Sequence, residues 1–214
     1  MARLKVGVLI SGRGSNLQAL IDAAAEQAYP AEIALVISNN AAAEGLARAA
    51  RARIAHVALA HPNPAAFAAA ADAALRQSGA QFVALAGFMR ILDDGFVAAW
   101  RDRLVNIHPS LLPAFPGLHA QRQALAAGVK VAGCTVHFVR PVLDTGPIIA
   151  QAAVPVYADD DEERLAQRIL AAEHRLYPMA LRLYAEGRLR IDGDRVAIAG
   201  TAAPRGTMFN PPLS

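Results

Sequence analysis

The sequence predicts an α/β fold, a Rossmann-like, mostly parallel twisted sheet with helices on both faces and antiparallel strands in the C-terminal part. Three observations predict it. Short apolar segments alternate with stretches of helical spacing in the first half of the chain, a glycine-rich turn follows the first apolar segment, and two apolar segments succeed each other directly after residue 118. The alternation is typical of parallel strands joined by crossover helices, and the direct succession is typical of an antiparallel pair.

The first half of the chain is predicted to form five strands separated by four helices. The segment LKVGVLI is short, apolar and rich in β-branched residues, and it ends at the turn SGRGSN. After that turn, Leu17, Leu20 and Ile21 recur at helical spacing. The strands are expected at 4–10, 33–38, 54–59, 82–87 and 103–108, and the helices at 17–28, 44–52, 64–77 and 93–100.

The second half has a different organisation. Strands at 130–139 and 147–156 are joined by RPVLDTG, a link short enough for an antiparallel pair. A long helix is expected from Asp161 to Glu186, bent near Pro178 because proline lacks the amide N–H. An Asp-Gly pair then predicts a hairpin, and the tail from about 200 to 214 is expected to be poorly ordered. We expect a single domain over residues 1–214.

Composition argues against several classes of function. The net charge of +3 comes from basic residues scattered among acidic ones, so we expect no nucleic-acid partner. No apolar run approaches the roughly 20 residues of a membrane helix, and the first residues do not form a secretory segment, so we expect no membrane association and a cytoplasmic location. Cys134 is the only cysteine and the histidines lack metal-ligand spacing, so we expect no disulfide and no metal.

Polar residues stand where an apolar strand ends. In LVNIH, Asn106 and His108 project to the same face because side chains alternate along a strand. The carboxyl ends of parallel strands border the ligand crevice of such sheets, so we expect this pair there. Thr135 and His137 also share a face and are expected to line the same crevice, with His137 in a supporting role. Asp144 follows in the link between the two later strands. The structural alternatives are that Asn106 and His108 only end a strand with their hydrogen bonds satisfied, and that Asp144 is an ordinary turn residue.

The turn SGRGSN predicts a phosphate site. Gly12 and Gly14 allow the backbone to turn tightly, and the space beside Gly14 is expected to stay empty for a ligand. Ser15 or Asn16 is expected to cap the helix that follows, leaving free amides for an anion. Leu17 stands where a dinucleotide fingerprint has its third glycine, and no Lys-Ser/Thr pair ends the turn, so we expect a single phosphate. A plain strand-to-helix turn is the alternative.

Together these groups indicate acyl transfer without a nucleophilic enzyme residue. An amide and an imidazole stabilise a developing oxyanion, and a carboxylate holds the imidazole charged. Six motifs then carry a resemblance: VLISGRGSNLQALIDA, LAGFMRIL, NIHPSLLPAFPGLHAQRQAL, GCTVHFV, LDTGPII and EHRLYP. In this order and spacing, between about residues 5 and 190, the chain resembles the folate-dependent formyltransferases, in particular the phosphoribosylglycinamide formyltransferase family of de novo purine synthesis.

The resemblance implies transfer of a formyl group from 10-formyltetrahydrofolate, as co-substrate, to the amine of glycinamide ribonucleotide. These two small molecules are the partners it implies, and a homodimer stays open. By motif match it also implies a catalytic set, ribotide-binding residues, a folate pocket and residues behind the catalytic set. The catalytic set is Asn106, His108 and Asp144. The ribotide-binding residues are Gly14, Ser15 and Asn16 for the phosphate and Glu173 for the glycinamide end. The folate pocket comprises Met89, Arg90, Ile91, Leu92 and Asn106, and the residues behind the catalytic set are Thr135 and His137.

Two positions depart from the family pattern. Pro64 stands where relatives often carry a basic residue, so a contact to the folate tail is expected to be missing, and DTGP around Asp144 replaces the more frequent Asp-Gly-Gly-Pro. Other functions stay open. They are a formyltetrahydrofolate hydrolase, a formyltransferase that acts on initiator aminoacyl-tRNA or a sugar nucleotide, and a non-catalytic module that binds phosphate or folate.

Overall fold

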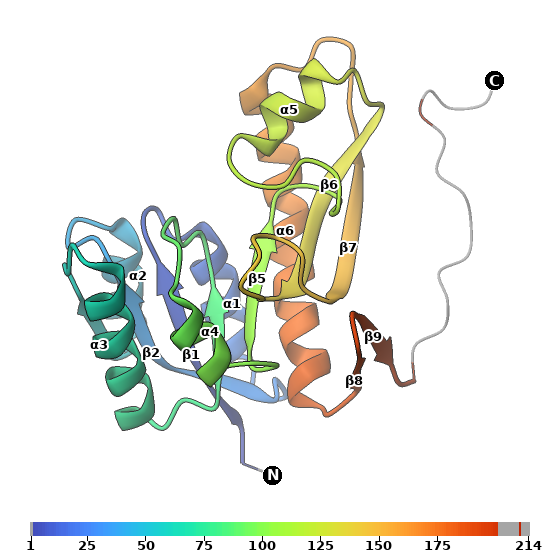
Figure 1. The fold of residues 1–214 in the computed structure, drawn as a ribbon. Helices are drawn as coiled ribbons and strands as arrows, with labels where there is room; N and C mark the ends of the chain where they lie inside the picture. Colours follow the sequence, from blue (N-terminus) through green and yellow to red (C-terminus); the bar gives the residue numbers. More distant parts are fainter. Residues whose placement is uncertain (1, 201–209, 211–214) are drawn as a thin grey trace.

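The computed structural model describes residues 2–200 and residue 210, and it confirms the predicted fold class (Figure 1). The strands are β1 Leu4–Ile10, β2 Ala31–Ser38, β3 His56–Ala58, β4 Phe82–Leu85, β5 Leu104–His108, β6 Val131–Phe138, β7 Ile148–Pro155, β8 Leu189–Asp192 and β9 Arg195–Ile198. The helices are α1 Ser15–Ala25, α2 Glu44–Arg51, α3 Pro64–Gln77, α4 Asp94–Ala99, α5 Ala120–Ala126 and α6 Glu162–Ala185.

Seven of the strands form one sheet in the order β3-β2-β1-β4-β5-β6-β7. Strands β1 to β5 pair in parallel, whereas β6 pairs antiparallel with both β5 and β7. Strands β8 and β9 make a separate antiparallel hairpin. The parallel region, the antiparallel pair and the hairpin are therefore confirmed.

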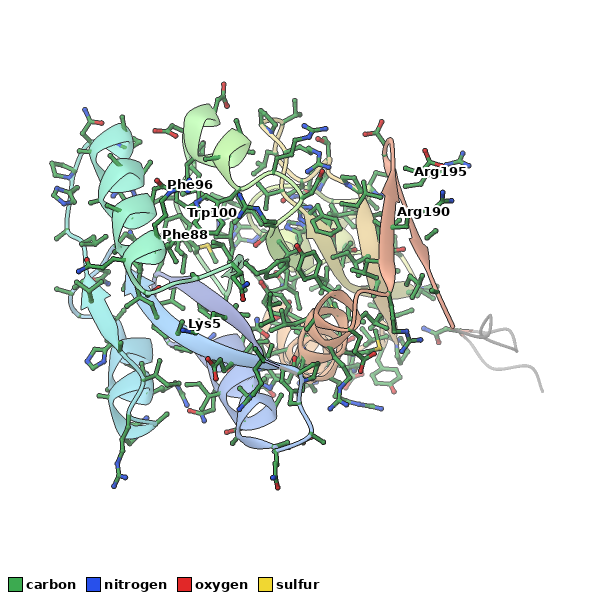
Figure 2. All side chains as sticks on the ribbon, turned by 90° about the horizontal axis from the view of Figure 1, so that it is seen from below. Lys5, Phe88, Phe96, Trp100, Arg190 and Arg195 are labelled. Carbon is green, nitrogen blue, oxygen red and sulfur yellow. The ribbon has the colours of Figure 1, made fainter. Side chains whose placement is uncertain are left out.

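Helices cover both faces of the sheet because its central strands are apolar on both sides. In β1, Val8 packs in the core that contains α1 and α6, whereas Leu9 packs in the core that contains α3 and α4. Figure 2 shows Phe88, Phe96 and Trp100 gathered on the α3–α4 side. This double burial makes the centre of the sheet a rigid support for the residues at its edge.

Local sequence explains where two helices begin. Asn63 caps α3 by accepting hydrogen bonds from N–H groups of its first turn, and Pro64 occupies the first helical position, where a missing N–H breaks no hydrogen bond. Asp161 caps α6 in the same way. Helix α6 then continues through Pro178 to its end, so this proline lies inside a single helix.

Two helices differ from the prediction. Helix α1 begins at Ser15, because Gly14 is its N-cap in a left-handed conformation (φ 70°), and no side chain caps it. The expectation that Ser15 or Asn16 caps this helix is therefore wrong, since both lie in its first turn. Helix α5 lies in a stretch for which no element was expected. Its seven residues are too few to give a periodic signal.

Within the described ranges, none of the helices combines the length and the apolar character that crossing a membrane requires. Over the same residues, no three His, Cys, Asp or Glu side chains gather where they could hold a metal ion. The expectation about the tail from 200 to 214 lies, apart from residues 200 and 210, outside the described residues.

Candidate active site

The candidate site lies at the carboxyl ends of the parallel strands. Strand β1 has β2 on one side and β4 on the other, so the chain connections diverge there, which is where sheets of this type bind ligands. Ser11 follows β1 and joins the neighbouring loops. Its Oγ donates a hydrogen bond to Asn39 Oδ1 (2.6 Å) and accepts one from Met89 N (2.7 Å). Residues that follow three different strands are thus held together.

Asn106 and His108 lie on β5, opposite two polar residues of β6. The antiparallel register pairs Asn106 with His137 and His108 with Thr135. Partners across a ladder share a face of the sheet, as do residues two apart along a strand. The structure therefore brings these four side chains together on one face.

His108 is buried, with 6 % of its side chain exposed, and each ring nitrogen faces an oxygen. Nδ1 lies 3.4 Å from Asp144 Oδ2, and Nε2 lies 2.9 Å from the carbonyl oxygen of Phe115. Asp144 Oδ2 also accepts a hydrogen bond from Gly117 N (2.8 Å). The backbone of Asp144 adopts a left-handed conformation (φ 55°), which aspartate tolerates well. Because a carbonyl oxygen can only accept, the 2.9 Å contact places a proton on Nε2, and the Asp144 carboxylate lies beside the other ring nitrogen.

His137 contacts the amide of Asn106. Its Nε2 lies 3.4 Å from Asn106 Nδ2, and its Nδ1 lies 3.0 Å from Phe138 O. Burial lowers the pKa of His137, although Phe138 O and the Asp144 carboxylate, 3.7 Å from Nε2, act in the other direction. These contacts fit a neutral ring with its proton on Nδ1, a tautomer that we infer from the hydrogen bonds. His137 Nε2 then accepts a hydrogen bond from one N–H of the Asn106 amide, and the second N–H of that amide is left for a ligand.

Thr135 fastens the loop that follows His108. Its Oγ1 donates to Ser110 O (2.7 Å) and accepts a hydrogen bond from Leu112 N (3.0 Å). Gln151 Nε2 lies 3.0 Å from the same hydroxyl. Thr135 is fully buried, so it acts on the shape of the loop.

The glycine turn packs against α2, and this packing explains why position 14 requires glycine. A Cβ on Gly14 would lie 2.7 Å from the Cα of Gly45. The expectation that Gly14 keeps space open for a ligand is therefore wrong, because helix packing and the positive φ already require glycine there. A Cβ on Gly12 would meet nothing within 4 Å. Gly12 is thus the glycine with open space beside it, and Ser15 offers an N–H at the start of α1.

Asn16 and Glu173 form a buried pair between α1 and α6. Nδ2 of Asn16 donates to Oε2 of Glu173 at 2.7 Å, and the two residues are 8 % and 6 % exposed. Burial raises the pKa of Glu173 to about 7, and the hydrogen bond from Asn16 opposes this rise. Asn16 Oδ1 is buried and has no hydrogen-bond partner among the described residues. A residue expected near the phosphate thus touches the residue expected near the glycinamide end.

Comparison with known proteins identifies the family. The profile of the family described as formyl transferase matches residues 4–181. The phosphoribosylglycinamide formyltransferase of Escherichia coli (strain K12) is 44 % identical over 210 residues, which cover 94 % of this chain and 99 % of that protein. The chain belongs to the formyl transferase family. The resemblance of the six sequence motifs is thereby confirmed.

Two further relatives show how far the similarity extends. The trifunctional purine biosynthetic protein adenosine-3 of Drosophila pseudoobscura pseudoobscura is 53 % identical over 95 % of this chain, but the chain spans only 15 % of that protein's length. The crystal structure of glycinamide ribonucleotide transformylase 1 from Symbiobacterium toebii has a TM-score of 0.89 and 55 % identity. That match covers 92 % of this chain and 94 % of the solved one.

The segment after β4 that is expected in the folate pocket exposes apolar side chains to solvent. Met89 is 69 % exposed and Ile91 is 82 % exposed, whereas Leu92 packs in the core on the α3–α4 side. The backbone N–H of Met89 is already bonded to Ser11. Met89 and Ile91 are therefore accessible to a ligand.

Arg90 connects this segment to the position of Pro64. Its guanidinium donates hydrogen bonds to the carbonyl oxygens of His61 (2.7 Å) and Pro62 (3.0 Å). The loop before α3 is therefore held by Arg90, and Pro64 serves as the first residue of that helix.

The second departure, Thr145, fits the loop around Asp144. Thr145 Oγ1 donates to Val142 O (3.0 Å), and the left-handed conformation falls on Asp144. A Cβ on Gly146 would lie 1.7 Å from Phe138 O, so that glycine is required by packing. The DTGP sequence thus retains the one glycine that this loop needs for space.

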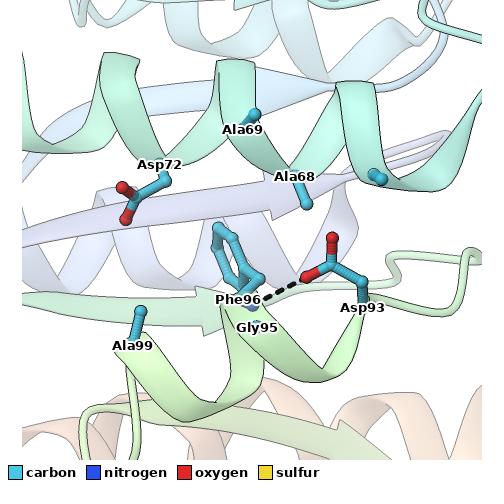
Figure 3. A pocket seen from close by; sticks show the side chains of 8 residues that line it. Ala68, Ala69, Asp72, Asp93, Gly95, Phe96 and Ala99 are labelled. Atoms are coloured by element: carbon cyan, nitrogen blue, oxygen red, sulfur yellow. Dashed lines mark hydrogen bonds between the residues drawn. The ribbon is translucent and has the colours of Figure 1, made fainter.

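A hollow of about 230 Å³ lies between α3 and α4 (Figure 3). Alanine side chains form much of its lining, and its two carboxylates already have partners. Asp93 accepts from Phe96 N (2.7 Å) as the cap of α4, and Asp72 accepts from Trp100 Nε1 (2.9 Å) and Arg76 Nε (2.8 Å). Both carboxylates of this hollow are thus engaged by contacts between and within the packed helices, so we assign it no ligand.

Proposed function

We propose that this protein transfers the formyl group of 10-formyltetrahydrofolate to the amine of glycinamide ribonucleotide, a step of de novo purine synthesis. The observation that carries the proposal is the cluster at the end of β5, where the amide of Asn106 lies beside His108 and the carboxylate of Asp144 lies 3.4 Å from the His108 ring. Relatives of this chain named for the same reaction support it. The proposal needs no metal.

The amine attacks the formyl carbon directly. The carbonyl becomes an oxyanion, which Asn106 Nδ2 and His108 stabilise as hydrogen-bond donors. Collapse of the intermediate breaks the bond to the folate nitrogen, which takes up a proton, while the attacking nitrogen loses one. Asp144 favours the charged form of His108 through its negative charge. The His108 Nε2 proton now faces Phe115 O at 2.9 Å, so donation to the oxyanion requires that this contact be exchanged for the substrate.

The proposed substrate positions follow from groups of matching chemistry. Glu173 and Asn16 Oδ1, which has no partner within the described part of the chain, offer acceptor oxygens, which suits the N–H groups of the glycinamide end. The free amides near Gly14, Ser15 and Asn16 suit the phosphate. The exposed apolar side chains of Met89 and Ile91, together with Leu92, Arg90 and Asn106, form the proposed folate site.

The deciding experiment supplies purified protein with 10-formyltetrahydrofolate, with and without glycinamide ribonucleotide. Mass spectrometry detects formylglycinamide ribonucleotide, and absorbance follows tetrahydrofolate release. We expect tetrahydrofolate only when the ribotide is present, in equal amount to the formylated product. Release of formate and tetrahydrofolate without the ribotide indicates a hydrolase instead. Binding of both ligands without any product indicates a non-catalytic module.

We also infer a cytoplasmic enzyme that works on small molecules, without nucleic acid or membrane, as a single domain over residues 1–214. Two cores that share one sheet support the single domain. A homodimer is tested by light scattering across a range of protein concentrations, where a molar mass of twice 22.5 kDa supports it and one of 22.5 kDa at every concentration contradicts it.

A further inference from the structure

A second hollow, of about 380 Å³, lies where α1, α2 and α6 meet. Four residues of α1 form one wall, Arg48 of α2 forms another, and His174 of α6 forms the third. The α1 residues are Ser15, Gln18, Ala19 and Asp22. The hollow therefore begins at the first turn of α1, directly after the glycine turn.

Arg48 is held in a defined orientation at this end. Its Nε donates to Arg13 O (2.8 Å), and its Nη1 donates to Gln18 Oε1 (3.3 Å). Gln18 is fixed in turn, because its Nε2 donates to Asp22 Oδ1 (2.8 Å). The bonds from Arg48 to Arg13 O and to Gln18 Oε1 use two of the five N–H donors of the guanidinium, so the remaining donors can still bind an anion.

Packing places the stem of Arg48 beside the N-cap of α1. A Cβ on Gly14 would lie 3.5 Å from Arg48 Cδ, and Gly45 N donates to Gly12 O at 3.1 Å. Helix α2 is thus attached to the same turn whose amides begin α1. A fixed positive charge and free backbone N–H groups therefore meet at one place, which is the combination that a phosphate requires.

The other ionisable groups of the hollow do not cancel this charge. Burial and the nearby Arg48 lower the pKa of His174, which disfavours a second positive charge here, and the buried Nε2 of His174 has no hydrogen-bond partner among the described residues. Asp22 lies seven residues after Ser15, about 10 Å further along the helix axis. Gln18 lies between Asp22 and Arg48 and is hydrogen-bonded to both, whereas the Arg48 guanidinium contacts Arg13 O directly, so its charge lies at the end of the hollow near Ser15.

We propose that Arg48 binds the phosphate monoester of the ribotide, and that Gln18 positions the Arg48 guanidinium. This assignment rests on the proposed function and adds a charged side chain to a phosphate site that the sequence predicted only from the turn SGRGSN. Arg48 donates a bidentate pair of hydrogen bonds to two phosphate oxygens, and the backbone N–H groups at the start of α1 donate to the third.

The first test measures binding of ribose 5-phosphate by calorimetry, without any turnover. Arg48→Met keeps the apolar stem beside Gly14 and removes the charge. Arg51→Met, on an exposed position of the same helix, is the matched control for net charge. We expect the Kd of Arg48→Met to rise about 10- to 100-fold, and that of Arg51→Met to stay within twofold of wild type.

The second test uses turnover with glycinamide ribonucleotide and with its phosphate-free riboside. The ratio of the two kcat/KM values should fall about 10- to 100-fold in Arg48→Met and remain constant in Arg51→Met. Gln18→Leu should lower the ratio by a smaller factor, about 3- to 10-fold, because the charge remains but loses its support. An equal loss with both substrates means that Gln18 has only a structural role.

The outcomes separate this assignment from the proposed reaction. If wild type binds ribose 5-phosphate, Arg48→Met binds it weakly and no product forms with 10-formyltetrahydrofolate, the reaction is wrong and the phosphate site stands. If wild type fails to bind ribose 5-phosphate at millimolar concentration, or Arg48→Met binds as tightly as Arg51→Met, the assignment is overturned. Should Arg48→Met not fold, Arg48→Lys replaces it, and an affinity equal to wild type overturns the assignment because lysine lacks the fork.

Discussion

Asn16 Nδ2 donates a 2.7 Å hydrogen bond to Glu173 Oε2 across 157 positions of sequence. The bond joins the first turn of α1 to the middle of α6, and it is buried from solvent. This hydrogen bond therefore links the proposed phosphate end of the ribotide site to its proposed amine end. A carboxyl whose pKa is raised to about 7 by burial lies at this junction, which makes the pair sensitive to pH.

Glu173→Gln should change how stability depends on pH. In the folded wild type the Glu173 carboxyl keeps its proton up to a pKa of about 7, whereas in the unfolded chain it loses it near 4.5. The folded state thus binds the extra proton between these values, and the free energy of unfolding falls as pH rises from about 4.5 to 7, by at most roughly 3 kcal/mol. The variant should lack this fall. Urea denaturation at pH 4.5, 6 and 8 measures it.

Glu163→Gln is the control for Glu173→Gln, because it removes a carboxyl from an exposed position of the same helix. Its stability should follow the wild-type pH dependence. Parallel curves for wild type and Glu173→Gln would contradict the raised pKa.

Asp144→Asn should lower kcat about 10- to 100-fold while the protein stays folded. Asparagine tolerates the left-handed backbone and can still accept the hydrogen bond from Gly117 N, but it removes the negative charge 3.4 Å from His108 Nδ1. Steady-state kinetics at saturating substrates and thermal melting measure the two effects. A kcat within threefold of wild type returns Asp144 to the role of a turn residue.

His108→Ala should lower kcat about 100- to 1000-fold, since one preorganised donor to the oxyanion is lost, while both substrates still bind. Asn106→Ala should behave similarly. His137→Ala should be milder, because His137 acts on the amide of Asn106 rather than on the substrate. His119→Ala is the matched control, with 64 % of its side chain exposed. If His137→Ala loses as much activity as His108→Ala, the ranking of the two histidines is wrong.

Gly12→Ala and Gly14→Ala should separate ligand space from packing. A methyl group on Gly14 meets Gly45 Cα and forces a positive φ on alanine, so the free energy of unfolding should fall by about 1–3 kcal/mol. A methyl group on Gly12 meets no protein atom within 4 Å, so stability should change by less than about 0.5 kcal/mol while the KM for the ribotide rises. Thermal unfolding and ribotide kinetics test both variants. An unchanged ribotide KM in Gly12→Ala places the phosphate away from this glycine.

Elements whose causes are local could be predicted from neighbouring residues alone. Alternating apolar segments and helical spacing predicted the parallel strands β1 to β5, and the period of two placed Asn106 and His108 on one face of β5. Asp-Gly near residue 193 predicted the β8–β9 hairpin. Each of these signals depends on a few neighbouring residues and on backbone geometry. Helix α5 escaped prediction because its seven residues span only two turns.

Contacts between residues far apart in the sequence could not be predicted and became visible in the folded chain. The fold places Glu173 against Asn16, Arg48 beside the turn at Arg13, and Phe115 O against His108 Nε2. It also showed that Gly14 is needed for the approach of α2, which no local pattern reveals. These contacts depend on how helices pack across the sheet, and packing is set by the whole core rather than by spacing along the chain. The candidate site is therefore local in its residue types and tertiary in its geometry.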